Sequence, residues 1–173
     1  MSDLRYPIGK WGREPVTSDA ERKTLLDQIA AAPANLRKAV TGLSETQLDT
    51  HYRPGGWSVR QVVHHVPDSH MNAYVRFKLA LTEDDPIIKP YMEDRWAELP
   101  DSRRPIENSL AMLDSLHNRW TTLLRSLKDE DWKRTFRHPE LGSVPLEKNL
   151  ALYSWHGRHH VAHVTSLRER MGW

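Results

Sequence analysis

Histidine is the residue type whose number and spacing point to chemistry in this chain. There are ten histidines among 173 residues, and four of them fall between positions 156 and 163. His156 and His160 are four residues apart, as are His159 and His163. In an α-helix this spacing places two imidazoles on one side, with Cβ atoms about 5–6 Å apart. Two such rings can bind one metal ion at about 2.0–2.1 Å from nitrogen.

The surrounding hydrophobic pattern distinguishes the two pairs. The helix face that carries His156 and His160 also carries the residues expected to point inward, namely Tyr153, Val164 and Leu167. His159 and His163 lie on a more polar side of the same helix. We therefore expect His156 and His160 to face the interior, either as metal ligands or as packed histidines.

A third ligand has to come from another segment, and residues 64–70 offer three more histidines. Periodicity slightly favours His70, which shares a stripe with Val66, although a packed histidine would show the same pattern. His65 lies at the edge of that stripe. Asp68 is either an acceptor for the second N–H of a ligand histidine or an ordinary solvated carboxylate.

Other chemically capable residues have plainer interpretations. His117 falls on an apolar stripe, where a hydrogen-bonded core histidine is expected more often than a ligand or a substrate contact. Trp57, Trp96 and Trp132 lie near loops and are expected to anchor them rather than line a pocket.

Four long helices are expected to position these side chains. Hydrophobic residues recur every three or four positions over about 19–43, 58–82, 105–128 and 146–171. Capping-box patterns at Ser18 and Ser58 mark the first two starts. Pro33 should kink or split the first helix, and Pro67 should disturb the second just after His65. Pro105 suits the first position of the third helix.

The connections are short or irregular. We expect an irregular N-terminal arm to about Thr17, a helical turn at 44–47, a loop at 52–56, a short helix at 93–99 and a loop or small hairpin at 132–145. The chain shows no other strand pattern. The sequence therefore predicts an all-α four-helix bundle that forms a single domain over residues 1–173.

Composition excludes several function classes. The chain has no cysteine, which excludes disulfides, thiolate metal sites and a cysteine nucleophile. Its 25 basic and 23 acidic residues leave a net charge of +2, too small to favour nucleic-acid binding. No run approaches the ~18 apolar residues of a membrane span, and the first residues lack the apolar region of a signal peptide. A cytoplasmic protein is expected.

Two histidine segments carry a resemblance to a known family. The run Tyr52-Arg53-Pro54-Gly55-Gly56-Trp57 leads into His64-His65, and Trp155-His156 leads into His159-His160. Together with the closing Arg170-Met171-Gly172-Trp173, the chain resembles the YfiT-type metal-dependent hydrolases of the DinB-like superfamily. That superfamily also includes bacillithiol S-transferases. The resemblance extends over essentially the whole chain.

The resemblance implies a four-helix bundle, a homodimer and one divalent metal ion per chain, with zinc favoured over nickel. Matched position by position, the metal ligands would be His65, His156 and His160. The family therefore favours His65 over His70 as the third ligand. Pro67 departs from the family, whose members usually have a small helix former there.

Three functions are compatible with such a site. The first is hydrolysis of a small electrophilic substrate by water activated at an open metal position. The second is transfer of a low-molecular-weight thiol, which would come from outside because the chain has no cysteine. The third is a non-catalytic metal-binding bundle.

Overall fold

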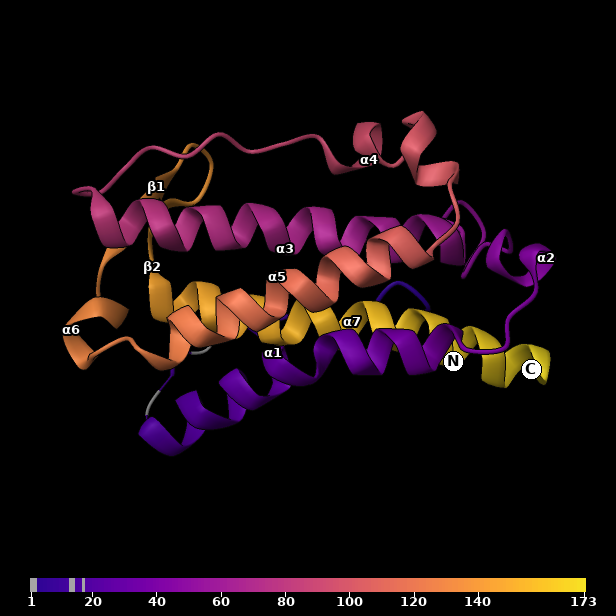
Figure 1. The fold of residues 1–173 in the computed structure, drawn as a ribbon, viewed down its shortest axis with the longest axis horizontal. Coiled ribbons are helices and arrows are strands. Elements are labelled where there is room, and N and C mark those ends of the chain that lie inside the picture. Colours follow the sequence, from indigo (N-terminus) through magenta and orange to yellow (C-terminus); the bar gives the residue numbers. More distant parts are fainter. Residues whose placement is uncertain (1–2, 13–14, 17) are drawn as a thin grey trace.

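Four long helices lie side by side in the computed structural model, which describes residues 3–12, 15–16 and 18–173 (Figure 1). They are α1 (Asp19–Val40), α3 (Val59–Thr82), α5 (Glu107–Arg125) and α7 (Leu146–Met171). Short helices occupy the connections: α2 (Glu45–Leu48), α4 (Glu93–Trp96), the 3-10 helix η1 (Pro100–Arg103) and α6 (Asp129–Trp132). The predicted four-helix bundle with short connecting helices is confirmed.

The order of the helices around the bundle differs from their order along the chain. Helix α1 packs against α5 and α7, and α3 packs against the same two helices. The consecutive long helices α1 and α3 therefore lie diagonally across the bundle, as do α5 and α7. As a result, α3 and α7, which carry the histidine segments, are direct neighbours.

The helix starts follow the capping patterns of the sequence. Ser18 accepts a hydrogen bond from the Glu21 backbone at the start of α1. Ser58 forms a complete capping box with Gln61 at the start of α3. The expectation for Pro105 is wrong, because α5 begins at Glu107 with Ile106 before it.

Both internal prolines lie within continuous helices. Helix α1 runs through Pro33 without splitting and bends along its length in Figure 1. Helix α3 is likewise unbroken at Pro67, so the disturbance expected after His65 does not interrupt it. A proline has no N–H to donate to the carbonyl four residues earlier. In α1 the carbonyl that loses this bond is that of Ile29.

A small hairpin and a long connection cover α3. Strands β1 (Thr135–His138) and β2 (Gly142–Pro145) pair antiparallel, with Phe136 opposite Val144. This is the hairpin alternative predicted for 132–145. The chain after α3 pairs with β1 through the Ile88 N–H and the Arg137 carbonyl, 3.0 Å apart. It then returns along α3 towards α4 (Figure 1).

The N-terminal arm lies against α7. Residues 3–12 form two turns, and the Arg5 and Gly9 carbonyls contact His163 and Trp155 of α7. The expected end of this arm, Thr17, lies outside the described residues.

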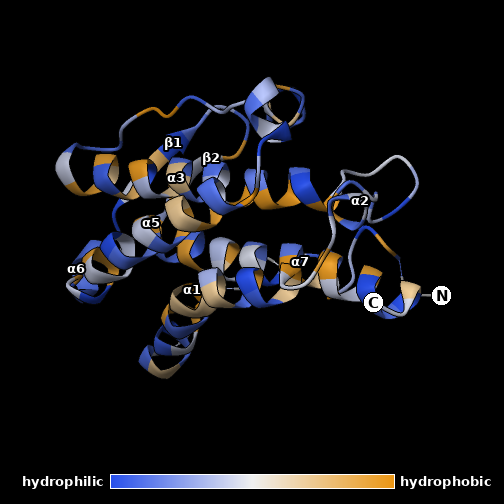
Figure 2. Ribbon diagram, turned by 45° about the vertical axis from the view of Figure 1, so that its right-hand side comes forward, coloured by the Kyte–Doolittle hydropathy of each residue, from blue (hydrophilic) through white to orange (hydrophobic). Residues whose placement is uncertain are grey.

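The apolar core has two parts with polar side chains between them. One part, near the start of α3, includes Val62 and Leu113. The other includes Phe77 and Trp120. Figure 2 shows that hydrophobic and hydrophilic residues alternate along the long helices. The buried His70 and His117 lie between the two parts, since His70 falls between Val66 and Ala73 on α3 and His117 falls between Leu113 and Trp120 on α5. No helix in the described part of the chain is both long and apolar enough to span a membrane.

Candidate metal centre

Three histidines from neighbouring helices meet inside the bundle. His65 comes from α3, and His156 and His160 come from successive turns of α7. Each contributes a ring nitrogen, and these nitrogens all lie within 4.8 Å of one another. The Nε2 atoms of His65 and His156 are 3.2 Å apart. We call these three residues the histidine cluster.

The spacing of the cluster suits a metal ion. In tetrahedral coordination with zinc–nitrogen bonds of 2.0–2.1 Å, two ligand nitrogens are about 3.3 Å apart. The separation of the His65 and His156 Nε2 atoms, 3.2 Å, matches that value. Imidazole ligands suit zinc, nickel, copper and iron, and they disfavour magnesium and calcium. The residues present therefore fit a divalent transition metal.

Burial keeps the three imidazoles neutral. Desolvation lowers the pKa of His65 to about 4, with a smaller effect from His159. Desolvation, and secondarily the neighbouring histidines, lowers the pKa of His156 and of His160 well below the usual value. A neutral imidazole retains the nitrogen lone pair that metal binding requires.

His70, which periodicity slightly favoured as the third ligand, lies behind the cluster instead. It is fully buried, and both of its ring nitrogens have partners. Its Nε2 atom is 3.1 Å from His156 Nδ1, and its Nδ1 atom is 2.8 Å from His117 Nε2. His117 is a hydrogen-bonded core histidine, as expected, with its Nδ1 2.8 Å from the Ile29 carbonyl oxygen.

The other histidine pair of α7 faces the N-terminal arm rather than the cluster. His159 stacks on Trp155 at 4.2 Å between ring centroids. His163 stacks on Tyr52 at 4.0 Å, and its Nε2 is 3.1 Å from the Arg5 carbonyl oxygen. The expectation of a less inward position for His159 and His163 is wrong, because both are buried whereas His156 is only partly buried. The choice of His156 and His160 as metal ligands stays a prediction.

Aromatic and hydroxyl side chains surround the cluster. The Trp57 ring lies 4.6 Å from the His65 ring, so this residue contributes to the site although the sequence suggested a loop anchor. Ser69 Oγ lies 3.4 Å from His156 Nε2 and 3.5 Å from the Tyr153 hydroxyl. Sequence reasoning missed Ser69 and the site contact of Tyr153. The helical spacing contained a signal, since Ser69 follows His65 by four residues and Tyr153 precedes His156 by three.

Asp68 is half-buried on α3, one turn after His65. Burial raises the pKa of its carboxyl to about 6, with a smaller contribution from Asp101. At His156, the second ring nitrogen that Asp68 might have served is paired with His70. Asp68 as a partner of a ligand histidine therefore stays a prediction.

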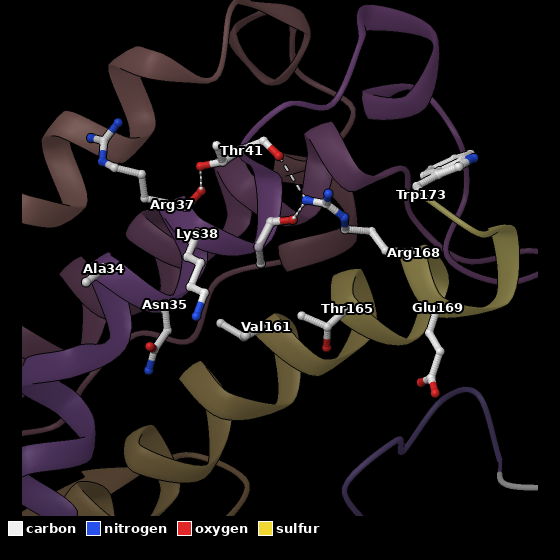
Figure 3. Close-up of a pocket in the computed structure, with 11 residues that line it drawn as sticks. Ala34, Asn35, Arg37, Lys38, Thr41, Val161, Thr165, Arg168, Glu169 and Trp173 are labelled. Atoms are coloured by element: carbon white, nitrogen blue, oxygen red, sulfur yellow. Dashed lines mark hydrogen bonds between the residues drawn. The ribbon is translucent and has the colours of Figure 1, made fainter.

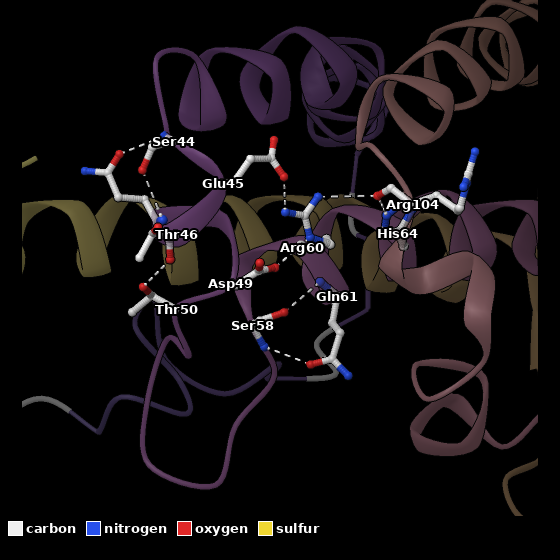
Figure 4. A network of polar contacts seen from close by, with 11 residues as sticks. Ser44, Glu45, Thr46, Asp49, Thr50, Ser58, Arg60, Gln61, His64 and Arg104 are labelled. Atoms are coloured by element: carbon white, nitrogen blue, oxygen red, sulfur yellow. Dashed lines mark hydrogen bonds and ion pairs between the residues drawn. The ribbon is translucent and has the colours of Figure 1, made fainter.

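The first turns of α3 are fixed by polar contacts to neighbouring elements. The buried Arg60 guanidinium donates to Asp49 and Glu45, each at 2.6 Å (Figure 4). His64 lies 2.7 Å from Ser109 Oγ on α5 and 2.9 Å from the Arg104 carbonyl oxygen. These contacts hold the turn that presents His65.

A large groove lies elsewhere on the molecule. It measures about 930 Å³ and runs between α1 and α7, where Lys38, Val161 and Trp173 contribute to its walls (Figure 3). Arg168 spans it, with hydrogen bonds to the carbonyl oxygens of Ala39 and Thr41. None of the clustered histidines lines this groove, so its size does not identify the chemical site.

Comparison with known proteins identifies the family and agrees with the fold. Residues 28–164 match the model of the DinB superfamily. Proteins from Bacillus cereus strains B4264 and G9842, each named "Putative metal-dependent hydrolase", are 58% identical over 100% of both chains.

Two solved structures have the same kind of fold. YfiT from Bacillus subtilis is 50% identical, with a TM-score of 0.95 over 98% of each chain. It is described as "a probable metal-dependent hydrolase with an unusual four-helix bundle topology". A second four-helix bundle protein, at 18% identity and a TM-score of 0.57, covers 81% of this chain and 94% of its own, and shows likeness of fold alone.

Proposed function

The chain belongs to the DinB superfamily, and from that premise and its histidine cluster we propose that it is a metal-dependent hydrolase of small electrophilic substrates. The observation that carries the proposal is the meeting of three imidazoles whose ring nitrogens lie within 4.8 Å of one another. The names of the Bacillus relatives agree with it. Zinc is the metal that the donor set and its spacing fit best, with nickel as the alternative.

The clustered histidines have a defined part in this function. His65, His156 and His160 would hold the ion without adding negative charge to it, since each imidazole is neutral. An ion held by these three residues would supply a Lewis acid that activates water and polarises an electrophile.

Neighbouring side chains would serve the reacting groups. Trp57 and Tyr153 form apolar walls beside His65 and His156. Ser69 Oγ, 3.4 Å from His156 Nε2, can hydrogen-bond to a substrate oxygen at the cluster. Asp68 has a pKa raised to about 6 by burial, which suits a carboxylate that accepts a proton near neutral pH. It also lies one turn after His65 on α3, and on these two grounds we propose it as the proton acceptor.

Zinc-dependent hydrolysis of p-nitrophenyl acetate tests the proposal. The wild-type protein should hydrolyse this activated ester in proportion to bound zinc. His156→Ala should abolish both zinc binding and turnover. Asp68→Asn should keep zinc and lower kcat by roughly 10²–10⁴-fold, the usual contribution of a general base. Turnover that persists in His156→Ala would contradict the proposal.

The same preparation tests the thiol-transfer alternative. The chain has no cysteine, so a thiol substrate must be added. Conversion of 1-chloro-2,4-dinitrobenzene only when bacillithiol is present, together with absent ester hydrolysis, would replace hydrolysis by thiol transfer. Zinc bound without either reaction would favour the non-catalytic bundle.

A further inference from the structure

A line of hydrogen bonds from the histidine cluster crosses all four long helices. It starts at His156 on α7, where Nδ1 lies 3.1 Å from Nε2 of His70 on α3. It continues from His70 Nδ1 to His117 Nε2 on α5 over 2.8 Å. It ends where His117 Nδ1 meets the Ile29 carbonyl oxygen on α1, also at 2.8 Å. We call His70, His117 and the Ile29 carbonyl the histidine relay.

The chemistry of the last group determines the direction of every bond in the line. A carbonyl oxygen can only accept, so His117 must carry its proton on Nδ1. A neutral His117 then has a lone pair on Nε2 and accepts from His70 Nδ1–H. By the same step, His70 accepts at Nε2 from His156 Nδ1–H. His156 is left with its lone pair on Nε2, the atom that lies 3.2 Å from His65 Nε2.

Pro33 explains why the Ile29 carbonyl is available for this role. In an uninterrupted α-helix that carbonyl would accept the N–H of residue 33. Proline has no N–H, and its ring pushes against the carbonyl four residues earlier. The carbonyl is buried within the bundle and would otherwise be an unsatisfied polar group. His117 supplies the missing donor from the adjacent helix α5.

We propose that the histidine relay fixes His156 as the Nδ1–H tautomer and thereby aims its Nε2 lone pair at the metal position. His70 and His117 are positioning residues, since they act through His156. The functional meaning of this inference rests on the proposed metal site, but the tautomers themselves can be measured without metal. In many proteins a carboxylate or a backbone carbonyl orients a ligand histidine directly. Here two imidazoles carry that orientation from a carbonyl on the far side of the bundle.

The packing around the relay leaves little freedom for other arrangements. The His70 ring lies 4.9 Å from the His117 ring and 5.8 Å from Trp120. Gly157 of α7 faces the same ring, and a Cβ built there would lie 3.5 Å from His70 Cε1. His70 therefore has a close neighbour on each side that holds its ring plane.

The first experiment is a long-range ¹H–¹⁵N spectrum of the histidine rings in the metal-free wild-type protein at pH 7.5. His156→Gln assigns the His156 signals by removing them. We expect His156, His70 and His117 to be protonated at Nδ1 alone, whereas free histidine in water prefers the Nε2–H form. An Nε2–H tautomer at His156 would overturn the proposal. This result does not depend on metal binding or on turnover.

The second experiment measures zinc affinity by competition with a chromophoric chelator. His117→Phe and His70→Leu should each bind zinc roughly 10–100-fold more weakly, the usual effect of losing a partner of a ligand histidine. His70→Gln should lose less than His70→Leu, because the Gln amide both accepts and donates. His163→Phe is the matched control, since His163 is also buried and also contacts a backbone carbonyl.

The zinc affinities of these variants distinguish the histidine relay from a general effect of disturbed packing. Weaker binding confined to the His70 and His117 variants supports the relay. Equal losses in His163→Phe, or unchanged affinity in His117→Phe, would overturn it. Absence of zinc binding in the wild type would defeat the proposed metal site, and the tautomer spectrum would still decide whether the relay exists.

Discussion

Lowering the pH should destabilise the metal-free protein strongly, because its buried histidines must become charged. Desolvation by burial lowers the pKa of both His65 and His117 to about 4. An unfolded histidine has a pKa of about 6.5. Below pH 6.5 the unfolded chain therefore binds more protons than the folded chain. The free energy of unfolding falls as the pH drops from 6.5 towards 4.

The size of the effect follows from these pKa values. Between pH 8 and pH 5, a histidine whose pKa moves from 6.5 to 4 on folding costs about 2 kcal/mol of stability. His65 and His117 together account for about 4 kcal/mol. Asp68 acts in the opposite direction, because its pKa is raised to about 6. Allowing for its partial exposure, it returns at most about 1 kcal/mol at pH 5.

The net loss from these three groups is about 3 kcal/mol, a large share of the 5–15 kcal/mol typical of a domain. Urea unfolding followed by tryptophan fluorescence, with a chelator present at both pH values, measures the total loss. Burial lowers the pKa of His159 and of His163 to about 4 as well, so each adds about 2 kcal/mol to that total. His163→Phe is the comparison variant, since burial lowers the pKa of His163 to about 4 as well. Its loss between pH 8 and pH 5 should be about 2 kcal/mol smaller than that of the wild type. A wild-type change below about 1 kcal/mol would refute the reasoning.

Three substitutions test the packing that supports the site. Gly157→Ala places a Cβ 3.2 Å from Ala32 Cβ and 3.5 Å from His70 Cε1. The crowding should cost about 1–3 kcal/mol, more than the gain of about 1 kcal/mol in helix propensity. Thermal unfolding should therefore show a lower Tm than that of the wild type. Trp120→Ala removes a fully buried side chain and should cost about 3–5 kcal/mol in urea unfolding, whereas a cost below about 1 kcal/mol would contradict its place in the core. Arg60→Met removes a guanidinium whose two carboxylate partners are exposed, so it should lower the free energy of unfolding by only about 1 kcal/mol. The loss should be smaller at high salt, because salt screens the ion pairs. An undiminished loss at 1 M NaCl would show that packing of the side chain dominates.

The helices and their starts were predictable because they depend on local sequence. Apolar residues at helical spacing mark all four long helices, and Ser18 and Ser58 form caps from side chains three residues apart. The preference for His156 and His160 over His159 and His163 rests on the same periodicity. The bounds of the four long helices were therefore correct to within a few residues, whereas the burial of His159 and His163 did not follow from the pattern.

The choice of His65 over His70 did not follow from local pattern. Both lie on α3, and periodicity alone slightly favoured His70, which is the more buried of the two. Which one meets α7 at the cluster depends on the diagonal arrangement of the helices. That arrangement comes from the packing of residues far apart in the chain. The family resemblance supplied this information where periodicity could not.

The partner of Pro33 also lay beyond sequence reasoning. The proline signals a bend in α1 and a free carbonyl at Ile29, both of which are local. His117 reaches this carbonyl, and His70 joins His117 to His156. Both contacts depend on the packing of the four long helices against one another. Periodicity along one chain segment does not predict which side chains from four different helices will be in contact.

The most direct test of the central claim is the zinc content of the tag-free protein, measured by mass spectrometry after reconstitution and desalting. The structure predicts about one zinc per chain in the wild type and in the control His163→Phe. His65→Ala, His156→Ala and His160→Ala should each lose it. Zinc retained in all three variants, or absent from the wild type, would contradict a metal centre built from these histidines.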